Sequence, residues 1–474
     1  MIVNNLSEFL NTNINVIIIG SGPAGISTAI KLEKNKIKSL IVEAGGVEPE
    51  IDSSLYLSGE IKGDKYPELS STRLRQFGGT SGHWGGNCNP FKEEDLNEWP
   101  IKLKDLNKYS LEAKEILNLK KKFYDEKFSE NLKLYNLSWS DVRFGQKYLE
   151  HIKKSKYINL SLNTTFLNFN GQSKKIDSVT CSKNNNFYKL KANCYILSCG
   201  GIENSRLMLW SWEKNKSLIN YKLPIGKYYM NHPYYLIGEG LVIHNKYNSY
   251  FINNYILNKP LITCENEIYF SANKNFLEKN NILNSGIYLN FKVADNHNSI
   301  FKQIRCVAPK YFKKIYESIK AKEVYEIKIS TLQEQKPEKQ NSINLSNNFD
   351  PLKIPLSKIY WKRSPSEIKS ARLIAEELGK VFIDNEIGRI ALNNYLYDGT
   401  EEYDVTTGNH QLGGTRMGYN ESDSVVDKNL KVHGIENLYI NGSSVFRTGG
   451  HCHPTYTIVK LSIRLADHLK NLKI

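Results

Sequence analysis

Two histidines near the C-terminus lie in surroundings that could support acid–base chemistry. His410 begins the stretch HQLGGTRMG, and His453 lies in RTGGHCHPTYT, so both stand beside glycines and small residues. An unperturbed histidine has a pKa of about 6.5, which suits removal of a hydroxyl proton near neutral pH. Loop and cap histidines are also common beside glycines, so the residues alone leave a structural role open. For His451 and His232 we expect a structural role.

A glycine-rich turn near the N-terminus predicts a nucleotide site. The turn GSGPAG at 20–25 follows a β-branched run and precedes a helical pattern, and the next apolar strand ends on Glu43. Gly20 permits the tight turn, Gly22 lets the backbone approach a pyrophosphate, and Gly25 lets helix and strand pack closely. The helix N-terminus would face the phosphates. Glu43 follows Gly25 by 18 positions and would accept hydrogen bonds from a ribose diol.

This strand–helix–strand unit predicts a dinucleotide but does not distinguish NAD from FAD. The stretch RLRQFGGTSGHWGG at 73–86 combines glycines with two small hydroxyl residues and one tryptophan. Such a backbone could pass close to a flat ring system, although glycine and serine also suit a surface loop. At 193–210 a strand, a Gly-Gly turn and a helix repeat the mechanical pattern of the first unit.

The elements that must position these groups fall into two parts. Residues from 236 to about 400 have no glycine-rich nucleotide motif, and runs such as 287–293 alternate like strands of an antiparallel sheet. A helix is expected over 364–378 with Pro365 at its start, and a closing helix over 458–472. The sequence therefore predicts that the middle part forms a separate, mainly antiparallel lobe that covers the substrate.

Composition excludes several classes of protein. The chain has 474 residues, 40% of them hydrophobic, which excludes a single small module. No run approaches the roughly 20 apolar residues of a membrane-spanning helix, and the N-terminus lacks the features of a secretory signal. The seven cysteines show no CxxC pair and are expected to be free thiols. We therefore expect a cytoplasmic protein.

The formal charge of +15 has two interpretations. The chain is rich in Lys, Asn, Ile and Tyr, whose codons are AT-rich, so genome bias could supply the charge. Alternatively, the charge creates a field that favours an anionic substrate, acceptor or surface. The basic residues are dispersed rather than gathered in a stripe, which argues against nucleic acid as a partner.

Six motifs in a fixed order carry a resemblance to a known family. They are the turn unit with EAGG, RLRQFGGTSGHWGG, CGGIENSRLML, GKYYMNHP, HQLGGTRMG, and the ending NLYINGSSVFRTGGHCHPTYTIVKLSIRLADHL. Together they resemble the glucose-methanol-choline (GMC) family of FAD-dependent oxidoreductases over nearly the whole chain. The motifs are most similar to the branch of pyranose oxidases and bacterial sugar dehydrogenases.

The resemblance implies an α/β fold, α+β overall, with two domains. A Rossmann-like FAD-binding domain would comprise residues 1–235 and 401–474, and a mainly antiparallel β-sheet substrate domain residues 236–400. No metal is implied. The residues implied to bind FAD are Gly20, Gly22, Gly25, Glu43, Gly79, Thr80, Ser81, His83, Trp84, Thr165, Phe166, Ser444, Pro454 and Thr455.

The resemblance also implies a reaction, the oxidation of an alcohol to a carbonyl with hydride transfer to flavin N5. His410 occupies the position of the family's catalytic base, and His453 that of its partner, which would orient the substrate oxygen. If the two rings share a proton, the apparent pKa values belong to the pair. His453-Pro454 departs from the Asn-Pro usual in the sugar branch. The implied substrate is a sugar, a polyol or a sugar-containing metabolite.

Several alternatives stay open at this point. His83 matches a histidine that is joined covalently to the flavin in pyranose oxidases, whereas many relatives hold FAD without a bond. Arg447 replaces a common proline and could be a cation near the site or a solvated loop residue. The fold also serves hydroxynitrile lyases and could serve a non-catalytic flavin-binding partner. The electron acceptor is open, and no haem or iron–sulfur spacing indicates an internal relay.

Overall fold

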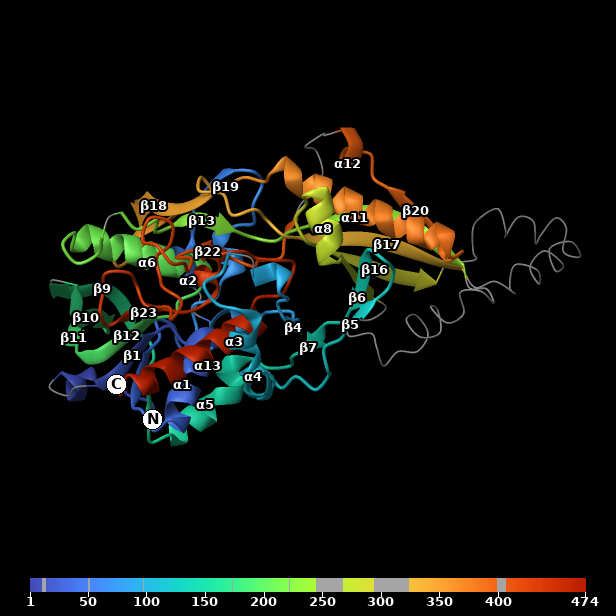
Figure 1. The fold of residues 1–474 in the computed structure, drawn as a ribbon. Helices are drawn as coiled ribbons and strands as arrows, with labels where there is room; N and C mark the ends of the chain where they lie inside the picture. The colour runs from blue at the N-terminus through green and yellow to red at the C-terminus, as the bar shows by residue number, and fades with distance from the viewer. Residues whose placement is uncertain are drawn as a thin grey trace, which may run out of the picture.

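A parallel sheet of buried β-branched strands forms the centre of one lobe (Figure 1). The computed structural model describes residues 1–474 except 11–13, 50–51, 97, 173, 221, 244–266, 294–323 and 399–405. The sheet has the order β23-β12-β1-β2-β8, and its neighbouring strands are all parallel. The strands are β1 (Ile14–Ile19), β2 (Ser39–Val42), β8 (Ile158–Ser161), β12 (Ala192–Leu197) and β23 (Leu438–Ile440).

Helices cover this sheet as the strand–helix–strand pattern predicts. Helix α1 (Pro23–Lys34) follows the glycine turn and packs against the closing helix α13 (Thr455–Asn471). Helix α6 (Gly201–Lys214) follows β12 after a second glycine turn. Short elements complete this lobe: α2 (Ser53–Leu57), α3 (Leu103–Asn107), α4 (Ser110–Ile116), α5 (Phe144–Lys154), β4 (Asn87–Cys88), β7 (Ser138–Trp139), β9 (Thr165–Gln172), β10 (Lys175–Lys183) and β11 (Asn186–Leu190).

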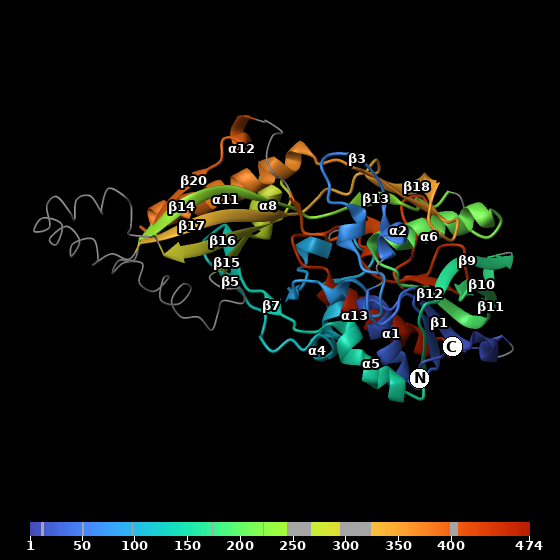
Figure 2. The same ribbon diagram turned by 180° about the vertical axis from the view of Figure 1, so that it is seen from behind.

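A second, eight-stranded sheet forms the other lobe, and its paired strands are antiparallel. Helix α11 (Pro365–Asp384) packs against its buried face (Figure 2). The strands are β5 (Asp125–Lys127), β6 (Leu132–Tyr135), β14 (Pro233–Ile243), β15 (Glu267–Ala272), β16 (Ser285–Val293), β17 (Val324–Gln333), β20 (Gly388–Leu392) and β21 (Thr406–Thr407). Helices α8 (Lys274–Asn280) and α12 (Tyr395–Asp398) complete it.

A third sheet of five strands packs against helix α6 of the first lobe, in the order β22-β13-β18-β19-β3. Its strands are β3 (Gly59–Gly63), β13 (Lys227–Met230), β18 (Ser342–Phe349), β19 (Pro355–Trp361) and β22 (Leu412–Gly414). Strand β13 leads into β14 of the antiparallel lobe. Strand β21, which pairs with the start of β14, is followed after four residues by β22 of the third sheet. The segments that carry the candidate histidines therefore run from one lobe into the other.

The mixed α/β fold expected from the sequence is confirmed. The domain boundaries at 235 and 400 stay a prediction. Strands β5 and β6, which precede residue 235, belong to the antiparallel sheet, whereas β18 and β19, from the expected substrate domain, belong to the third sheet. Helix α11 extends six residues past the expected end at 378, because Val381 and Phe382 continue its buried face.

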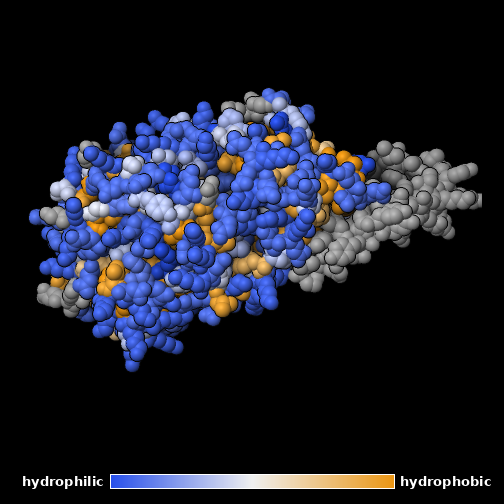
Figure 3. All heavy atoms as spheres, viewed as in Figure 1, coloured by the Kyte–Doolittle hydropathy of each residue, from blue (hydrophilic) through white to orange (hydrophobic). Residues whose placement is uncertain are grey.

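On the face shown in Figure 3, the described surface is mostly hydrophilic, and hydrophobic residues form small separate groups. Within the described ranges, no helix is long and apolar enough to cross a membrane. The five cysteines of those ranges are free, as expected, and Cys264 and Cys306 lie outside them.

Candidate active site

One large cavity extends from the glycine turn of the parallel sheet to the antiparallel lobe. Its volume is about 640 Å³, within the usual size of ligand sites. The cavity brings together fourteen of the sixteen predicted site residues. They are Gly20, Gly22, Glu43, Gly79, Thr80, Ser81, His83, Trp84, Thr165, Phe166, His410, His453, Pro454 and Thr455.

The two remaining predicted residues lie behind the cavity wall. A Cβ added to Gly25 would lie 2.0 Å from the carbonyl oxygen of Gly20, so Gly25 serves helix–strand packing. Ser444 is fully buried, and its Oγ pairs with Asn204 Nδ2 at 2.8 Å and with Thr415 Oγ1 at 2.7 Å. Ser444 therefore supports the wall, while its neighbour Ser443 lines the cavity.

The glycine turn fits a dinucleotide for reasons that differ between its glycines. Gly20 has φ +97°, and a Cβ there would lie 2.7 Å from the carbonyl oxygen of Ser198, so the fold itself requires glycine. Gly22 has the ordinary φ of −69°, and a Cβ there would meet no protein atom within 4 Å. The protein alone does not require glycine at this position, but a closely approaching ligand would.

Gly85 repeats this property on the opposite loop. It also has nothing within 4 Å of an added Cβ, and it lines the same cavity. Among the described glycines without a left-handed φ, only Gly22 and Gly85 have such open space. Neither the backbone angles nor the packing of the protein requires glycine at these two cavity positions. Their glycines therefore indicate a bound group that approaches the backbone closely. Helix α1 has no side-chain cap at its N-terminus, which leaves N–H groups for an anion there.

Glu43 is held at the end of β2 by the glycine turn. Its Oε2 accepts hydrogen bonds from the Ser21 backbone N–H at 3.0 Å and from Ser21 Oγ at 2.6 Å, and its Oε1 accepts one from Gly45 N–H at 2.8 Å. Burial raises the pKa of Glu43, and these hydrogen bonds oppose the rise. The carboxyl is fixed at the cavity wall, where a ribose diol could reach it.

The 78–86 loop is shaped by its own hydrogen bonds. Ser81 Oγ donates to the carbonyl of Gly78 at 2.7 Å and accepts from Phe144 N–H at 3.1 Å. Trp84 Nε1 donates to the carbonyl of Val142 at 2.9 Å, so its ring is fixed at the cavity. His83 is partly exposed on this loop; the partial burial of its ring, followed by the positive charge of Arg143, lowers its pKa.

The other end of the cavity carries the expected adenosine-side residues. Thr165 Oγ1 accepts a hydrogen bond from Arg75 Nη2 at 3.0 Å, and Phe166 is buried against Phe169. The guanidinium of Arg75 also lies 4.1 Å above the ring of Tyr56. Arg75 and Tyr56 line the cavity and were not predicted, because the sequence gives no sign that 56 and 165 lie together.

His410 is fixed by an asparagine from the GKYYMNHP motif. Oδ1 of Asn231 accepts hydrogen bonds from the backbone N–H of His410 at 2.9 Å and of His232 at 2.8 Å. Asn231 Nδ2 donates to Tyr66 OH at 2.7 Å, which holds the amide in this orientation. One side chain thus ties β13 to the segment that bears His410.

His453 is fixed by Asn89 from the opposite side. Oδ1 of Asn89 accepts the backbone N–H of His453 at 2.8 Å and lies 3.2 Å from the ring Nδ1. A backbone N–H can only donate, so the asparagine atom is an oxygen, and Nδ1 of His453 must carry the ring proton. Nε2 of a neutral His453 is therefore a hydrogen-bond acceptor.

The two candidate histidines lie side by side in a desolvated site. Their ring centroids are 5.0 Å apart. Burial lowers the pKa of His453 to about 4. Burial also lowers the pKa of His410 well below its usual value, and the neighbouring His453 and His232 add to this effect. Both rings are neutral near pH 7 and can take up a proton.

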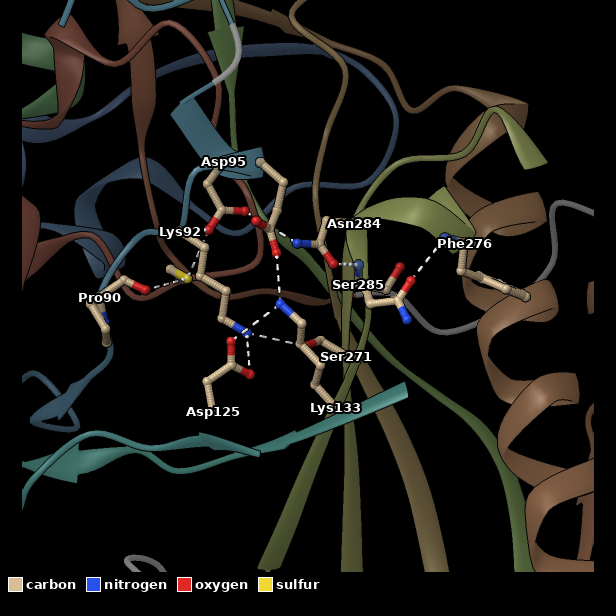
Figure 4. Close-up of polar contacts among 12 residues, drawn as sticks. Pro90, Lys92, Asp95, Asp125, Lys133, Ser271, Phe276, Asn284 and Ser285 are labelled. Atoms are coloured by element: carbon tan, nitrogen blue, oxygen red, sulfur yellow. Dashed lines mark hydrogen bonds and ion pairs between the residues drawn. The ribbon is translucent and has the colours of Figure 1, made fainter. Parts of the chain in front are cut away.

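A buried polar network supports the turn that bears His453, and Figure 4 shows the part of it around Asp95 and Asn284. Asp95 accepts hydrogen bonds from Lys92 N–H at 2.8 Å and from Asn284 Nδ2 at 3.2 Å, and Cys452 Sγ lies 3.7 Å from its Oδ2. Glu334 accepts hydrogen bonds from the N–H groups of Asn284 at 3.0 Å and Gly450 at 3.2 Å. Asn284 directly precedes β16 and Glu334 directly follows β17, so the network joins the ends of these two strands to residues 450–452.

The two carboxyl groups of this network make stability depend on pH. Burial raises the pKa of Asp95 to about 6, and burial with the charge of Asp95 raises the pKa of Glu334 to about 7. The native state therefore binds more protons than the unfolded chain between about pH 4 and pH 7, so stability falls as pH rises through this window. We expect unfolding midpoints to be lower at pH 8 than at pH 5.

Wild-type protein is expected to lose unfolding free energy between pH 5 and pH 8, and in the Glu334→Gln variant this loss should be smaller by roughly 3 kcal/mol. Urea unfolding at both pH values measures the change, and Glu48→Gln, at an exposed position, is the control with an unchanged loss. Burial also raises the pKa values of Glu43 and Glu367, which act in the same direction, so part of the loss should persist. A Glu334→Gln protein with the full wild-type loss would contradict this assignment.

Arg447 differs from both expectations formed from the sequence. Its side chain is only 12% exposed, and its Nη2 pairs with Asp423 Oδ2 at 2.7 Å and with Glu98 Oε2 at 3.4 Å. It does not line the cavity. The residue is neither a solvated loop arginine nor a cation at the site, because Asp423 and Glu98 compensate its charge.

His232, expected to be structural, contacts the candidate base directly. It is fully buried, and its Nδ1 lies 2.9 Å from Nδ1 of His410. The other residues missed from the sequence are Asn89, which fixes His453, and Glu267, Tyr234 and Tyr288 of the antiparallel lobe, which line the cavity. Only His232 had a sequence signal, its place in the motif GKYYMNHP. Across the described ranges no cluster of side chains could hold a metal ion.

Comparisons with known proteins show what the C-terminal part of the chain is similar to. Residues 337–462 match the family model described as GMC oxidoreductase. The fructose dehydrogenase large subunit of Gluconobacter japonicus is 30% identical over 160 residues, 34% of this chain and 28% of that protein. The 2-methyl-1,2-propanediol dehydrogenase of Mycolicibacterium austroafricanum is 23% identical over 292 residues, 60% of this chain and 48% of that protein. The matched regions span less than half the length of these relatives.

Solved structures share the fold over nearly the whole chain. Pyridoxine 4-oxidase from Mesorbium loti has a TM-score of 0.57 and 14% identity, with 96% of this chain and 99% of that chain covered. A formate oxidase from Aspergillus oryzae RIB40, studied for FAD modification, has a TM-score of 0.58 and 14% identity, with 98% and 99% covered. The expected resemblance is confirmed, and similarity to the sugar-oxidising branch in particular stays a prediction.

Proposed function

From the match of residues 337–462 to the GMC oxidoreductase family model, we propose that the chain binds FAD and oxidises an alcohol with adjacent hydroxyl groups. The observation that carries the proposal is the cavity itself. It runs from a dinucleotide turn, with Glu43 and the open glycines Gly22 and Gly85, to a pair of neutral histidines. Bound FAD would supply the acceptor for a hydride from the carbinol carbon.

His410 is proposed as the base of this reaction. Its ring lines the cavity, and its Nδ1 faces His232, so Nε2 is the nitrogen that can accept the hydroxyl proton. Loss of that proton and of a hydride from the same carbinol gives the carbonyl product. Low pKa values keep the histidines unprotonated at pH 7, which is the state a base requires.

His453 is proposed to orient the substrate through a second hydroxyl group. Because Asn89 holds the proton of neutral His453 on Nδ1, Nε2 accepts a hydrogen bond but cannot donate one. A single hydroxyl has one proton and cannot serve two acceptors. Two acceptor rings with centroids 5.0 Å apart therefore favour a vicinal diol, as found in sugars and polyols.

The charges around the cavity support a neutral rather than an anionic substrate. The arginines among its described lining residues, Arg75 and Arg206, belong to the nucleotide lobe, and Arg206 pairs with Glu203 at 2.9 Å and with Asp350 at 2.7 Å. On the antiparallel lobe the charged lining residue in the described ranges is Glu267. A carboxylate at that end would accept hydrogen bonds from further hydroxyl groups. The relatives named for fructose and for 2-methyl-1,2-propanediol agree with this class.

Anaerobic mixing of the FAD-loaded protein with a panel of alcohols tests the proposal. The panel pairs propane-1,2-diol with propan-2-ol and adds glycerol, fructose and glucose, and flavin absorbance is followed. We expect flavin bleaching, with the diol at least about tenfold faster than the mono-alcohol, because an unmet buried acceptor costs about 1–3 kcal/mol. Equal rates would contradict the diol assignment. A flavin that stays oxidised with every member would contradict alcohol oxidation, and cleavage of a cyanohydrin in that state would indicate a lyase.

A further inference from the structure

His232 lies behind the candidate base and outside the cavity. Its ring is fully buried and does not line the cavity, whereas His410 does. The two Nδ1 atoms are 2.9 Å apart, and the ring planes are nearly perpendicular at 88°. This distance is that of a hydrogen bond. Two facing ring nitrogens at this distance require one N–H and one lone pair, so the tautomers of the two rings are linked.

The surroundings of His232 favour one of the two arrangements. Its Nδ1 faces His410, so Nε2 points to the other side, where it lies against Gly449 and an added Cβ would be 2.8 Å away. Among the described residues no hydrogen bond of good geometry reaches Nε2, but the backbone of Gly449 and Gly450 favours the protonated ring, which places the N–H on the side of Gly449. With its proton on Nε2, neutral His232 presents a lone pair at Nδ1. His410 must then donate from its own Nδ1.

We infer that His232 is a positioning residue that accepts a hydrogen bond from Nδ1–H of His410 and thereby keeps Nε2 of His410 unprotonated toward the cavity. The inference rests on the proposed function for its catalytic meaning. In the opposite arrangement Nε2 of His410 would carry the proton, and His410 could not act as a base. The contact thus decides whether the ring that lines the cavity can accept a proton.

The backbone fixes the pair in register. Asn231 Oδ1 accepts the backbone N–H groups of both histidines, and Gly408 N–H donates to the carbonyl of His232 at 2.8 Å. Gly449 leaves the space that the His232 ring fills. Neither ring can therefore shift along the other without loss of several hydrogen bonds.

His232 stays neutral while it accepts. Burial, followed by the charge of His453, lowers its pKa to about 3. The titratable groups that face the pair are His453 beside His410 and the buried His451 behind it. When His410 takes up the substrate proton at Nε2, its ring becomes positively charged. Neutral His232, which accepts the hydrogen bond from Nδ1–H of His410, stabilises this charge and does not take the proton.

Histidine-selective ¹⁵N NMR of the FAD-loaded protein, without substrate, tests the tautomers directly. The His410 signals are assigned by their absence in His410→Ala. We expect wild-type His410 as the Nδ1–H tautomer and His232 as the Nε2–H tautomer. The Nε2–H form of His410 in the wild type would overturn the inference. Because no turnover is needed, this result stands apart from any failure of alcohol oxidation.

Two substitutions extend the test to the rate. His232→Leu removes the acceptor, and we expect flavin reduction to slow at least tenfold, since a wrong tautomer is costly in comparable sites. The acid limb of the rate should also move to lower pH. His232→Asn, whose Oδ1 replaces Nδ1, should recover most of the rate, and His468→Leu outside the cavity is the control. A His232→Leu enzyme with wild-type rate and pH profile would overturn the inference.

Discussion

Replacement of His410 by alanine is expected to slow anaerobic reduction of bound FAD by about 10²–10⁴-fold. The ring lies at the cavity wall, its Nδ1 is engaged with His232, and it is neutral at working pH. The methyl group of alanine cannot accept the hydroxyl proton, so the alkoxide character needed for hydride loss does not develop. FAD content should not change, because the glycine turn and Glu43 are elsewhere in the cavity.

Stopped-flow absorbance with the best diol of the panel measures this rate. The wild-type rate should be level near pH 7 and fall only below pH 6.5, since the unprotonated ring is the active form and its pKa is lowered. His453→Ala is the matched comparison and should lose mainly the preference for diols over mono-alcohols. If His410→Ala reduced flavin normally while His453→Ala did not, the roles of the two rings would be reversed.

Gly22→Ala is expected to weaken FAD binding by about 10–100-fold without loss of the fold. The added methyl would meet no protein atom within 4 Å, and φ at this position is −69°. A methyl forced into a packed contact costs about 1–3 kcal/mol, which corresponds to that range of affinity. Titration of the FAD-free protein with FAD, followed by flavin fluorescence, gives the dissociation constant.

Gly25→Ala is the matched control because the chemical change is identical and only the place differs. Its Cβ would lie 2.0 Å from the carbonyl oxygen of Gly20, so we expect a loss of about 3 kcal/mol or more in stability even without FAD. Gly22→Ala without FAD should unfold at the wild-type midpoint. If Gly22→Ala bound FAD with wild-type affinity, the dinucleotide would not pass at this turn.

The local part of the fold could be predicted from the sequence because its causes are local. The turn at 20–25 sits between a β-branched strand and a helix, and each glycine has a role that follows from sterics. The alternating run at 287–293 likewise predicted the strand Ser285–Val293. The order of strand, turn and helix and the alternation along a strand need no knowledge of distant partners, whereas the close approach of Ser198 to Gly20 comes only from the fold.

The support of the site could not be predicted because it depends on distant pairings. His232 and His410 are 178 residues apart, and Asn89 and His453 are 364 residues apart. Neither pair has a pattern that indicates contact. Arg447 was misjudged for the same reason, since Asp423 and Glu98 come to it only through the fold. The resemblance singled out His410 and His453, but not His232 and Asn89, which contact them.

The most direct test of the proposed chemistry is the stoichiometry of a single anaerobic turnover. FAD-loaded protein is mixed with an excess of the best diol, the flavin spectrum is recorded, and the carbonyl product is quantified. We expect one carbonyl product for each flavin reduced, and none in His410→Ala on the same timescale. A product formed while the flavin stays oxidised, or no reduction by any alcohol with FAD fully bound, would contradict alcohol oxidation at this site.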